Sequence, residues 1–359
     1  MRRPPALILG GGPAGAAAAI ALARHGIQAT ILERARETPD ALCGGFLSWQ
    51  TLAAAERLGL APETLNPNVI TRVRICVGGR VAEAPLPAPA RAVSRARLDT
   101  LLLDRVERLG VAIERGVTIR ALEGRSVRLG DGAALTGDTL LLATGKHDLR
   151  GSPRDPTPLA DPILGIRVRL PASRAIGDAV ELHLFDGGYV GLAVQEDGSA
   201  NFCMAVARSR LQAAGDPHAL LRALAAESPL LADRLARLDP AAPIDAVANV
   251  PYGWRTATTV DDVYRLGDQA AVIPSLAGEG LGIALASGVM AADAVAAGRS
   301  AADYQAGFAR RAARPLAAAG LIRAAADHTL GARLLLAATP IPGLARLAAR
   351  LTRIAHPSH

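Results

Sequence analysis

Aromatic residues and lysine are scarce in this chain of 359 residues. Phenylalanine, tyrosine and tryptophan supply 3% of the residues, whereas hydrophobic residues make up 50%, so alanine and aliphatic side chains must fill the core. Lys146 is the only lysine, and the net charge of +7 therefore comes from arginine. The arginines are dispersed and no aromatic residues are interleaved with them, which argues against a nucleic-acid partner.

Cysteines and long hydrophobic runs are also few. Cys43, Cys76 and Cys203 are odd in number and not at the spacing of metal ligands, a pattern typical of a reducing cytoplasm. The apolar run at the start is too short for a signal peptide, and no stretch is long enough to span a bilayer. No histidine cluster indicates a metal site. We therefore expect a cytoplasmic protein without a metal, at most peripheral to the inner membrane face.

The stretch 6–33, ALILGGGPAGAAAAIALARHGIQATILE, predicts a strand, a glycine turn, a helix and a second strand. Gly10, Gly12 and Gly15 form the pattern G-x-G-x-x-G, in which they allow a tight turn, the approach of a pyrophosphate and close helix packing. The helix start also offers free N–H groups to phosphates. Glu33 follows about 20 residues after the middle glycine, where a carboxylate can accept ribose hydroxyls. This order predicts dinucleotide binding.

The rest of the chain predicts a second domain inserted into the first. Alternating segments at 163–170, 179–185, 189–195 and 200–206 are joined by Gly-rich turns and predict an antiparallel sheet. An apolar strand at 263–266 then returns to the nucleotide-binding sheet. The expected fold is α/β: a discontinuous Rossmann-like domain (1–70, 90–160, 260–300), an inserted antiparallel-sheet substrate domain (71–89, 161–259) and C-terminal helices (301–359).

Four separated segments resemble the flavoprotein superfamily of aromatic hydroxylases, with its relatives the geranylgeranyl reductases and flavin-dependent halogenases. The similar segments are the Gly10–Glu33 unit followed by Arg34, Val93-x-Arg95-x-x-Leu98-Asp99, the strand end Ala143-Thr144-Gly145, and Gly267-Asp268 … Pro274 … Gly278-x-Gly280. Their order and spacing carry the resemblance, since each segment alone is common.

The resemblance implies FAD as the cofactor of the first domain. It implies that Arg95 contacts FAD, that Asp268 holds the ribityl chain and that the late glycines face the isoalloxazine. Judged without the family, Arg34 and Arg95 also fit solvated arginines, and Asp268 fits a turn residue. The predicted FAD contacts are Gly10, Gly12, Pro13, Ala14, Gly15, Glu33, Arg34, Cys43, Gly44, Gly45, Arg95, Val117, Ala143, Thr144, Gly145, Gly267, Asp268, Pro274, Gly278, Glu279, Gly280, Leu281 and Gly282.

The branch of the superfamily is less defined. Ala271-Val272-Ile273 stands where hydroxylases usually carry a histidine, while Cys43-Gly44-Gly45 and the stretch 278–288 are similar to the reductases. The reductases' Y-x-W-x-F-P box is absent, and the halogenases' catalytic lysine has no candidate, since Lys146 lies beside the nucleotide-binding strand. The whole chain is most similar to small bacterial flavoproteins that accompany type III polyketide synthases, which implies a lipophilic phenolic or quinone substrate.

We therefore expect an FAD-dependent monooxygenase that uses reduced flavin and O₂, with NAD(P)H as a transient electron donor because there is only one dinucleotide fingerprint. The alternative is a reductase of a C=C bond or quinone. Two other classes stay open: an FAD-containing protein without turnover, such as a lipid carrier, and an NAD-dependent dehydrogenase. The expected substrate is a small lipophilic aromatic or isoprenoid molecule, and the sequence does not predict the oligomeric state.

Two residues are candidates for catalysis. The thiol of Cys43 could relay a proton beside the flavin, or it could be a small buried hydrophobe. Tyr189 could hydrogen-bond the substrate or simply pack at a hairpin. His183 alternates with leucines on a strand and should point away from them. The C-terminal helices, with Arg346 and Arg350 beside leucines, fit either packing on the body or contact with a membrane surface.

Overall fold

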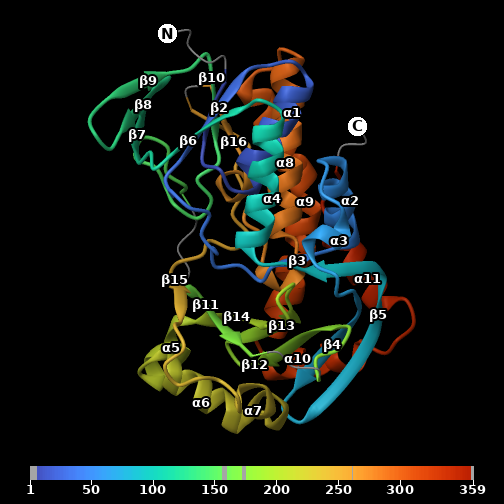
Figure 1. Cartoon of the computed structure of the whole chain (residues 1–359). Coiled ribbons are helices and arrows are strands. Elements are labelled where there is room, and N and C mark those ends of the chain that lie inside the picture. Colours follow the sequence, from blue (N-terminus) through green and yellow to red (C-terminus); the bar gives the residue numbers. More distant parts are fainter. Residues whose placement is uncertain (1–5, 156–159, 172–174, 261, 357–359) are drawn as a thin grey trace.

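The computed structural model describes residues 6–155, 160–171, 175–260 and 262–356 (Figure 1). Some predicted domain boundaries lie at or next to residues outside these ranges. They are the boundaries at residues 1, 260 and 359 and the connection near residue 160. Figure 1 shows a sheet beside long helices in one half of the molecule and a second sheet in the other half.

The first sheet is parallel, as the Rossmann-like prediction requires. Its strands lie in the order β16 (Val263–Arg265), β10 (Thr139–Leu142), β1 (Ala6–Leu9), β2 (Ala29–Glu33) and β6 (Ala112–Arg115). The chain proceeds from β1 to one edge through β2 and β6, and reaches the other edge later through β10 and β16. The loop after β1 therefore lies at the switch point where such sheets bind ligands.

The first sheet is covered on both faces because its strands are apolar on both sides. Ile8 packs into the core formed with the helices, whereas Leu7 and Leu9 pack against a small antiparallel sheet. The helices are α1 (Pro13–Arg24), α4 (Arg95–Arg108), α8 (Gly280–Ala296) and α9 (Ala301–Ala326), and the small sheet is β7 (Ile119–Glu123), β8 (Ser126–Leu129) and β9 (Ala134–Thr136).

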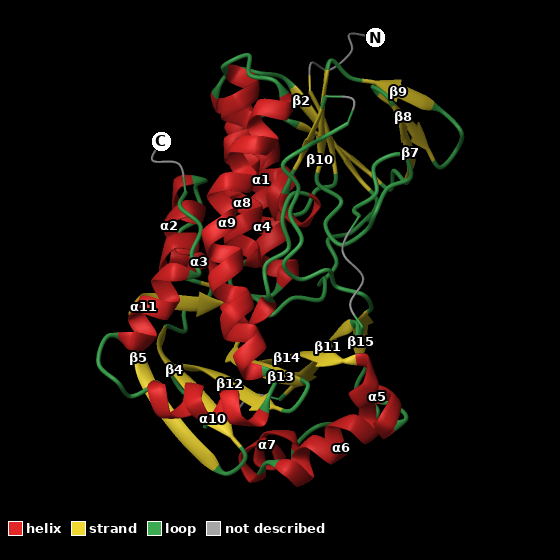
Figure 2. Ribbon diagram, turned by 180° about the vertical axis from the view of Figure 1, so that it is seen from behind, coloured by secondary structure: helices red, strands yellow, loops and turns green. Residues whose placement is uncertain are grey.

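The alanine and glycine content lets two of these helices approach closely (Figure 2). A Cβ atom on Gly288 of α8 would lie 2.4 Å from the carbonyl oxygen of Ala14 in α1. The alanines at 16–19 of α1 are fully buried. Close contact between helices rich in alanine and glycine therefore fills the space that large aromatic side chains would otherwise occupy.

The second sheet combines strands from two parts of the sequence. The antiparallel pairing predicted for β11, β12, β13 and β14 is confirmed, and strand β4 joins them by pairing with β12 in parallel. The reason is the connection: after β5 the chain passes through the first domain before it returns at β11 and β12. The order is β15 (Asp245–Val247), β11 (Ile163–Leu170), β14 (Ala200–Ala207), β13 (Gly188–Val194), β12 (Ala179–Phe185), β4 (Ile70–Val77), β5 (Arg80–Ala92) and β3 (Phe46–Leu47).

Short helices complete the molecule. The chain after residue 300 is helical as predicted, and α10 and α11 follow α9 near strands β4 and β5 (Figures 1 and 2). Within the described ranges, no helix combines the length and the apolar character needed to cross a bilayer. These helices are α2 (Trp49–Arg57), α3 (Pro62–Leu65), α5 (Arg208–Ala214), α6 (Pro217–Glu227), α7 (Pro229–Leu235), α10 (Thr329–Ala338) and α11 (Leu344–Leu351).

Candidate active site

One cavity of about 1200 Å³ runs between the two halves of the molecule. Its lining includes the early glycine turn from Gly10 to Ala14, and Ala277, Gly278, Gly280 and Leu281 of the late turn. The central strands of the second sheet form another part of its wall. The two glycine-rich segments, far apart in the sequence, thus border the same space.

The three glycines of the early turn have different surroundings. Gly10 has a φ of +114°, and a Cβ there would lie 2.5 Å from the carbonyl oxygen of Ala143. A Cβ on Gly15 would lie 2.0 Å from the carbonyl oxygen of Gly10. At Gly12 the φ is −69°, and a Cβ would meet only Arg95 Nη2, at 3.4 Å. Gly10 and Gly15 therefore preserve the turn, whereas Gly12 keeps open the approach from the cavity.

The early turn offers hydrogen-bond donors to a ligand. Helix α1 begins with Pro13, and no side chain in the described part of the chain caps its first N–H groups. Glu33 lines the same cavity and accepts hydrogen bonds from the N–H of Gly11 at 2.7 Å and of Ala35 at 2.8 Å. Each carboxylate oxygen retains acceptor capacity, so these bonds orient Glu33 and leave it able to accept ribose hydroxyls.

A partly buried cation lies beside this turn. Arg95 donates to both carboxylate oxygens of Asp99, from Nε at 2.9 Å and from Nη2 at 2.6 Å. Burial acts to lower the pKa of Arg95, but the charge of Asp99 outweighs it and the pKa lies above its usual value. Arg95 therefore stays protonated next to Gly12. A cation and an uncapped helix start together fit a pyrophosphate.

The late turn is held from behind by the C-terminal segment. Arg353 Nη1 donates to Glu279 Oε2 at 2.7 Å and to the carbonyl oxygen of Ala277 at 2.7 Å. The N–H of Ile354 donates to the other carboxylate oxygen of Glu279 at 3.1 Å. Gly278 is left-handed, and a Cβ there would lie 2.8 Å from Phe46. Contacts within the protein therefore hold the turn, and in the described chain no side chain caps the helix α8 that follows it.

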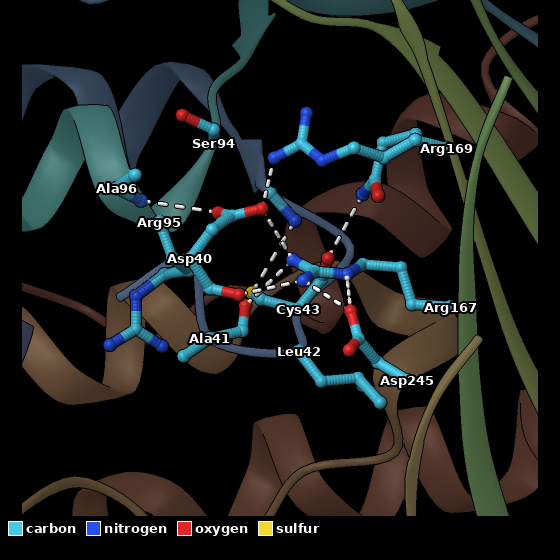
Figure 3. A network of polar contacts seen from close by, with 12 residues as sticks. Asp40, Ala41, Leu42, Cys43, Ser94, Arg95, Ala96, Arg167, Arg169 and Asp245 are labelled. Atoms are coloured by element: carbon cyan, nitrogen blue, oxygen red, sulfur yellow. Dashed lines mark hydrogen bonds and ion pairs between the residues drawn. The ribbon is translucent and has the colours of Figure 1, made fainter. Parts of the chain in front are cut away.

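A network of charges holds the loop that carries Cys43 (Figure 3). Arg167 of β11 donates to Asp40 Oδ2 at 2.8 Å and to the carbonyl oxygen of Ala41 at 3.0 Å, and it pairs with Asp245. Burial acts to raise the pKa of Asp40, but the N–H of Ala96 and nearby arginines outweigh it and hold this pKa below its usual value. The ionised Asp40 thus ties the loop to the second sheet and to α4.

The thiol of Cys43 borders the cavity within this loop. Asn201 Nδ2 donates to the carbonyl oxygens of Cys43 at 2.9 Å and Gly44 at 3.0 Å, and the N–H of Gly45 donates to Cys43 Sγ at 3.3 Å. Cys203 also lines the cavity, and burial raises the pKa of its thiol to about 12. Cys203 is therefore a neutral thiol, while a catalytic role for Cys43 stays a prediction.

Two tyrosines bring hydroxyl groups to the part of the cavity next to the second sheet. Tyr189 donates to Ser275 Oγ at 2.5 Å, and the Tyr252 hydroxyl lies 2.6 Å from the same atom. The guanidinium of the buried Arg323 lies over both rings, 5.5 Å and 5.7 Å from their centres. His183 lies on the face of β12 that points away from the cavity, as its alternation with the cavity-lining leucines indicates. Its Nε2 lies 3.2 Å from Glu181 Oε2.

Sequence reasoning missed Ser275 and Arg323. Ser275 follows Pro274 in the late turn, so its position was visible but its two tyrosine partners were not. Arg323 is one of several arginines in α9, and the helix pattern gave no signal that distinguishes it from the exposed ones.

Most of the predicted cofactor residues border the cavity. Gly15 and Gly282 do not, because each supports close packing: a Cβ on Gly282 would lie 2.4 Å from Glu279 Oε1. Glu279 is wholly buried against Arg353 and lies outside the lining, and so does Pro274. Those in the lining are Gly10, Gly12, Pro13, Ala14, Glu33, Arg34, Cys43, Gly44, Gly45, Arg95, Val117, Ala143, Thr144, Gly145, Gly267, Asp268, Gly278, Gly280 and Leu281.

The N-terminal third of the chain is similar to a known family. Residues 3–128 match the family model described as FAD binding domain. No curated protein sequence matches the chain. The match covers the early glycine turn, Glu33 and Arg95, and FAD is therefore the cofactor that the residues of this turn fit.

Solved structures share the whole fold at low sequence identity. The flavin-dependent brominase Bmp2 has a TM-score of 0.77 at 16% identity, over 98% of this chain and 93% of that one. A geranylgeranyl bacteriochlorophyll reductase-like protein from Thermoplasma acidophilum has a TM-score of 0.76 at 18% identity, over 96% and 94%. PqsL from Pseudomonas aeruginosa in complex with 2-aminobenzoylacetate has a TM-score of 0.73 at 17% identity, over 93% and 100%. The predicted fold is confirmed.

Proposed function

We propose that this FAD-dependent oxidoreductase is a monooxygenase that hydroxylates a neutral, lipophilic phenol with O₂ and electrons from NAD(P)H. PqsL, which shares the fold, is described as "a probable FAD-dependent monooxygenase". The observation that carries the proposal for this chain is the composition of the cavity wall next to the second sheet.

That wall is apolar, and its polar side chains other than the thiol of Cys203 are hydroxyls. No lining residue from the strands of the second sheet carries a charge in the described chain. A carboxylate substrate would lose its hydration there without gaining a cation, which is costly. An uncharged ring with an alkyl substituent suits these residues: Val73, Ile75, Val180, Leu182, Leu184, Leu192 and Met204.

Tyr189 and Tyr252 can orient a phenolic hydroxyl. Burial raises the pKa of Tyr252 to about 12 and that of Tyr189 well above its usual value, so both hydroxyls keep their protons. Ser275 accepts a hydrogen bond from Tyr189 and holds the two rings together. We assign these hydroxyls to substrate positioning.

The first domain would hold the cofactor. We assign the pyrophosphate to the start of α1 and Arg95, the adenosine ribose to Glu33, and the ribityl hydroxyls to Asp268. Bound FAD supplies electron transfer to oxygen and delivery of one oxygen atom to the ring. NAD(P)H would bind transiently as the donor, since the chain has one dinucleotide fingerprint.

The test measures stoichiometry with purified, FAD-loaded protein. Alkylphenols of increasing chain length are supplied with NAD(P)H and isotopically labelled O₂, and 4-hydroxybenzoate serves as the charged control. The expected result is one labelled oxygen atom in the product for each O₂ and each NAD(P)H consumed, with KM falling as the alkyl chain lengthens. The proposal is wrong if the phenols gain no label or if only the carboxylate is hydroxylated.

A reductase is the second candidate, favoured by the shared fold of the Thermoplasma acidophilum protein. It would transfer the two electrons to a quinone or a prenyl double bond without oxygen. Turnover of such an acceptor under anaerobic conditions, together with no labelled phenol in air, would select this alternative. A protein that retains FAD but turns over neither substrate class would indicate a carrier.

A further inference from the structure

The exposed apolar side chains of this protein gather on its C-terminal helices. Ten large hydrophobic residues are exposed in the described chain, and six of them lie between residues 321 and 347. This concentration on three consecutive helices differs from the scattered exposure that is normal for a surface. The six residues, called here the C-terminal patch, are Leu321, Leu330, Leu334, Ile341, Leu344 and Leu347.

The helix spacing places these side chains on common faces. Leu330 and Leu334 are four residues apart in α10 and are 71% and 63% exposed. Leu344 and Leu347 are three residues apart in α11, and Ile341 lies in the connection between the two helices. Residues three and four apart lie on the same side of a helix. The patch therefore presents leucines from two consecutive helices to the solvent.

The part of the patch that follows Asp327, which includes helices α10 and α11, carries positive charge only. From His328 to Arg353 the sequence contains four arginines and no aspartate or glutamate. Arg333, Arg346 and Arg350 are exposed, whereas Arg353 is engaged with Glu279. An apolar face bordered by exposed cations is the composition that binds the headgroup region of an anionic bilayer. A second copy would bring arginine against arginine, which disfavours a symmetric dimer through this patch.

The ligand cavity reaches the surface at the same place. Leu344 is exposed and also lines the cavity, together with Ala345, Ala348 and Ala349 of α11. We propose that the C-terminal patch docks the protein on the surface of an anionic phospholipid membrane, with the cavity mouth at α11 facing the lipid. The proposed docking is inferred from the surface residues alone. The entry of a lipophilic substrate from the bilayer depends, in addition, on the proposed function.

The experiment is co-sedimentation of the FAD-loaded protein with vesicles. One set contains phosphatidylcholine alone, and the other contains phosphatidylcholine mixed with phosphatidylglycerol, each at low and at high salt. The expected result is binding to the mixed vesicles that weakens as salt screens the charges. The absence of binding to the mixed vesicles would overturn the proposal.

Two surface variants test the two components of the patch. The variant L330S/L334S/L347S should lower partitioning at least tenfold, because it removes apolar area. The variant R333Q/R346Q/R350Q should lower it about 100-fold on the mixed vesicles only, about fivefold for each arginine. A matched control, L135S/R120Q, changes an exposed leucine and an exposed arginine of the small sheet at the other end of the molecule (Figure 1) and should bind like the original protein.

The remaining outcomes also decide the proposal. If the patch variants bind vesicles as the original protein does, the patch is not the docking surface. If sedimentation equilibrium shows a dimer that the leucine variant converts to a monomer, a second copy covers the patch and the proposal is wrong. FAD content and NAD(P)H oxidation with a short, water-soluble phenol are measured on the same preparations. Loss of docking should leave both unchanged, which separates this test from that of the proposed function.

Discussion

Replacing Gly12 with alanine separates cofactor binding from folding. The backbone at Gly12 is extended with a φ of −69°, which alanine adopts without strain, and the new Cβ would meet only the end of the Arg95 side chain, at 3.4 Å. Gly12 is also the N-cap of α1, where alanine is the poorer residue. The free energy of unfolding of the apoprotein should therefore fall by about 1 kcal/mol or less.

The same methyl group should weaken FAD binding much more. It occupies the approach to the uncapped N–H groups of α1, and overfilling a packed site costs roughly 1–3 kcal/mol. The Kd for FAD should rise by about 5- to 150-fold, measured by titrating apoprotein with FAD and following flavin fluorescence. Gly320→Ala in α9, where a Cβ meets no atom within 4 Å, is the control and should leave the Kd unchanged.

Gly15→Ala gives the contrasting result, since its Cβ would lie 2.0 Å from a carbonyl oxygen. This variant should unfold at a clearly lower temperature even without FAD. The assigned role of Gly12 would be refuted if the Gly12→Ala variant bound FAD as tightly as the original protein. It would also be refuted if the Gly12→Ala apoprotein were as unstable as the Gly15→Ala apoprotein.

Three further predictions concern buried charges. Burial acts to raise the pKa of Glu181, but hydrogen bonds from His183 and Arg234 outweigh burial and lower this pKa from 4.5 to about 2. The ionised carboxylate therefore stabilises the folded protein by about 3 kcal/mol above pH 4.5, and this stabilisation is lost as the pH falls toward 2. Urea unfolding measures the difference in free energy of unfolding between Glu181→Gln and the original protein. This difference should shrink on acidification, and a difference that stays constant with pH would contradict the assigned role of Glu181. Asp40 has a lowered pKa, so Asp40→Asn should likewise cost stability at neutral pH and less in acid, and it should speed FAD release in stopped-flow measurements. Arg353→Met leaves Glu279 buried without its cation and should cost roughly 3–5 kcal/mol in chemical unfolding, whereas an unchanged midpoint would show that the ion pair contributes nothing.

Local patterns in the sequence predicted the parts of the site that depend on local geometry. The early turn needs Gly10 at a positive φ and Gly15 without a side chain, and both requirements appear as glycines at fixed spacing. Alternation along β12 likewise placed Leu182 and Leu184 on one face and His183 on the other.

Features that depend on distant contacts were not predictable in this way. Glu279 stands among cavity-lining glycines, yet its carboxylate turns inward to Arg353, which is 74 residues later in the sequence. The hydroxyl group of Ser275 meets Tyr189 and Tyr252 only because two parts of the chain fold together. The parallel pairing of β4 with β12 depends on a long crossover through another domain, and hairpin signals report only neighbouring strands.

A crystal structure of the protein grown with FAD is the most direct test of the central claim. We expect electron density for an extended FAD, with its diphosphate at the N–H groups that follow Gly12 and its flavin ring beside the turn at Gly278–Leu281. Density for FAD at any other place on the molecule, or a cavity that stays empty in the presence of excess FAD, would contradict it.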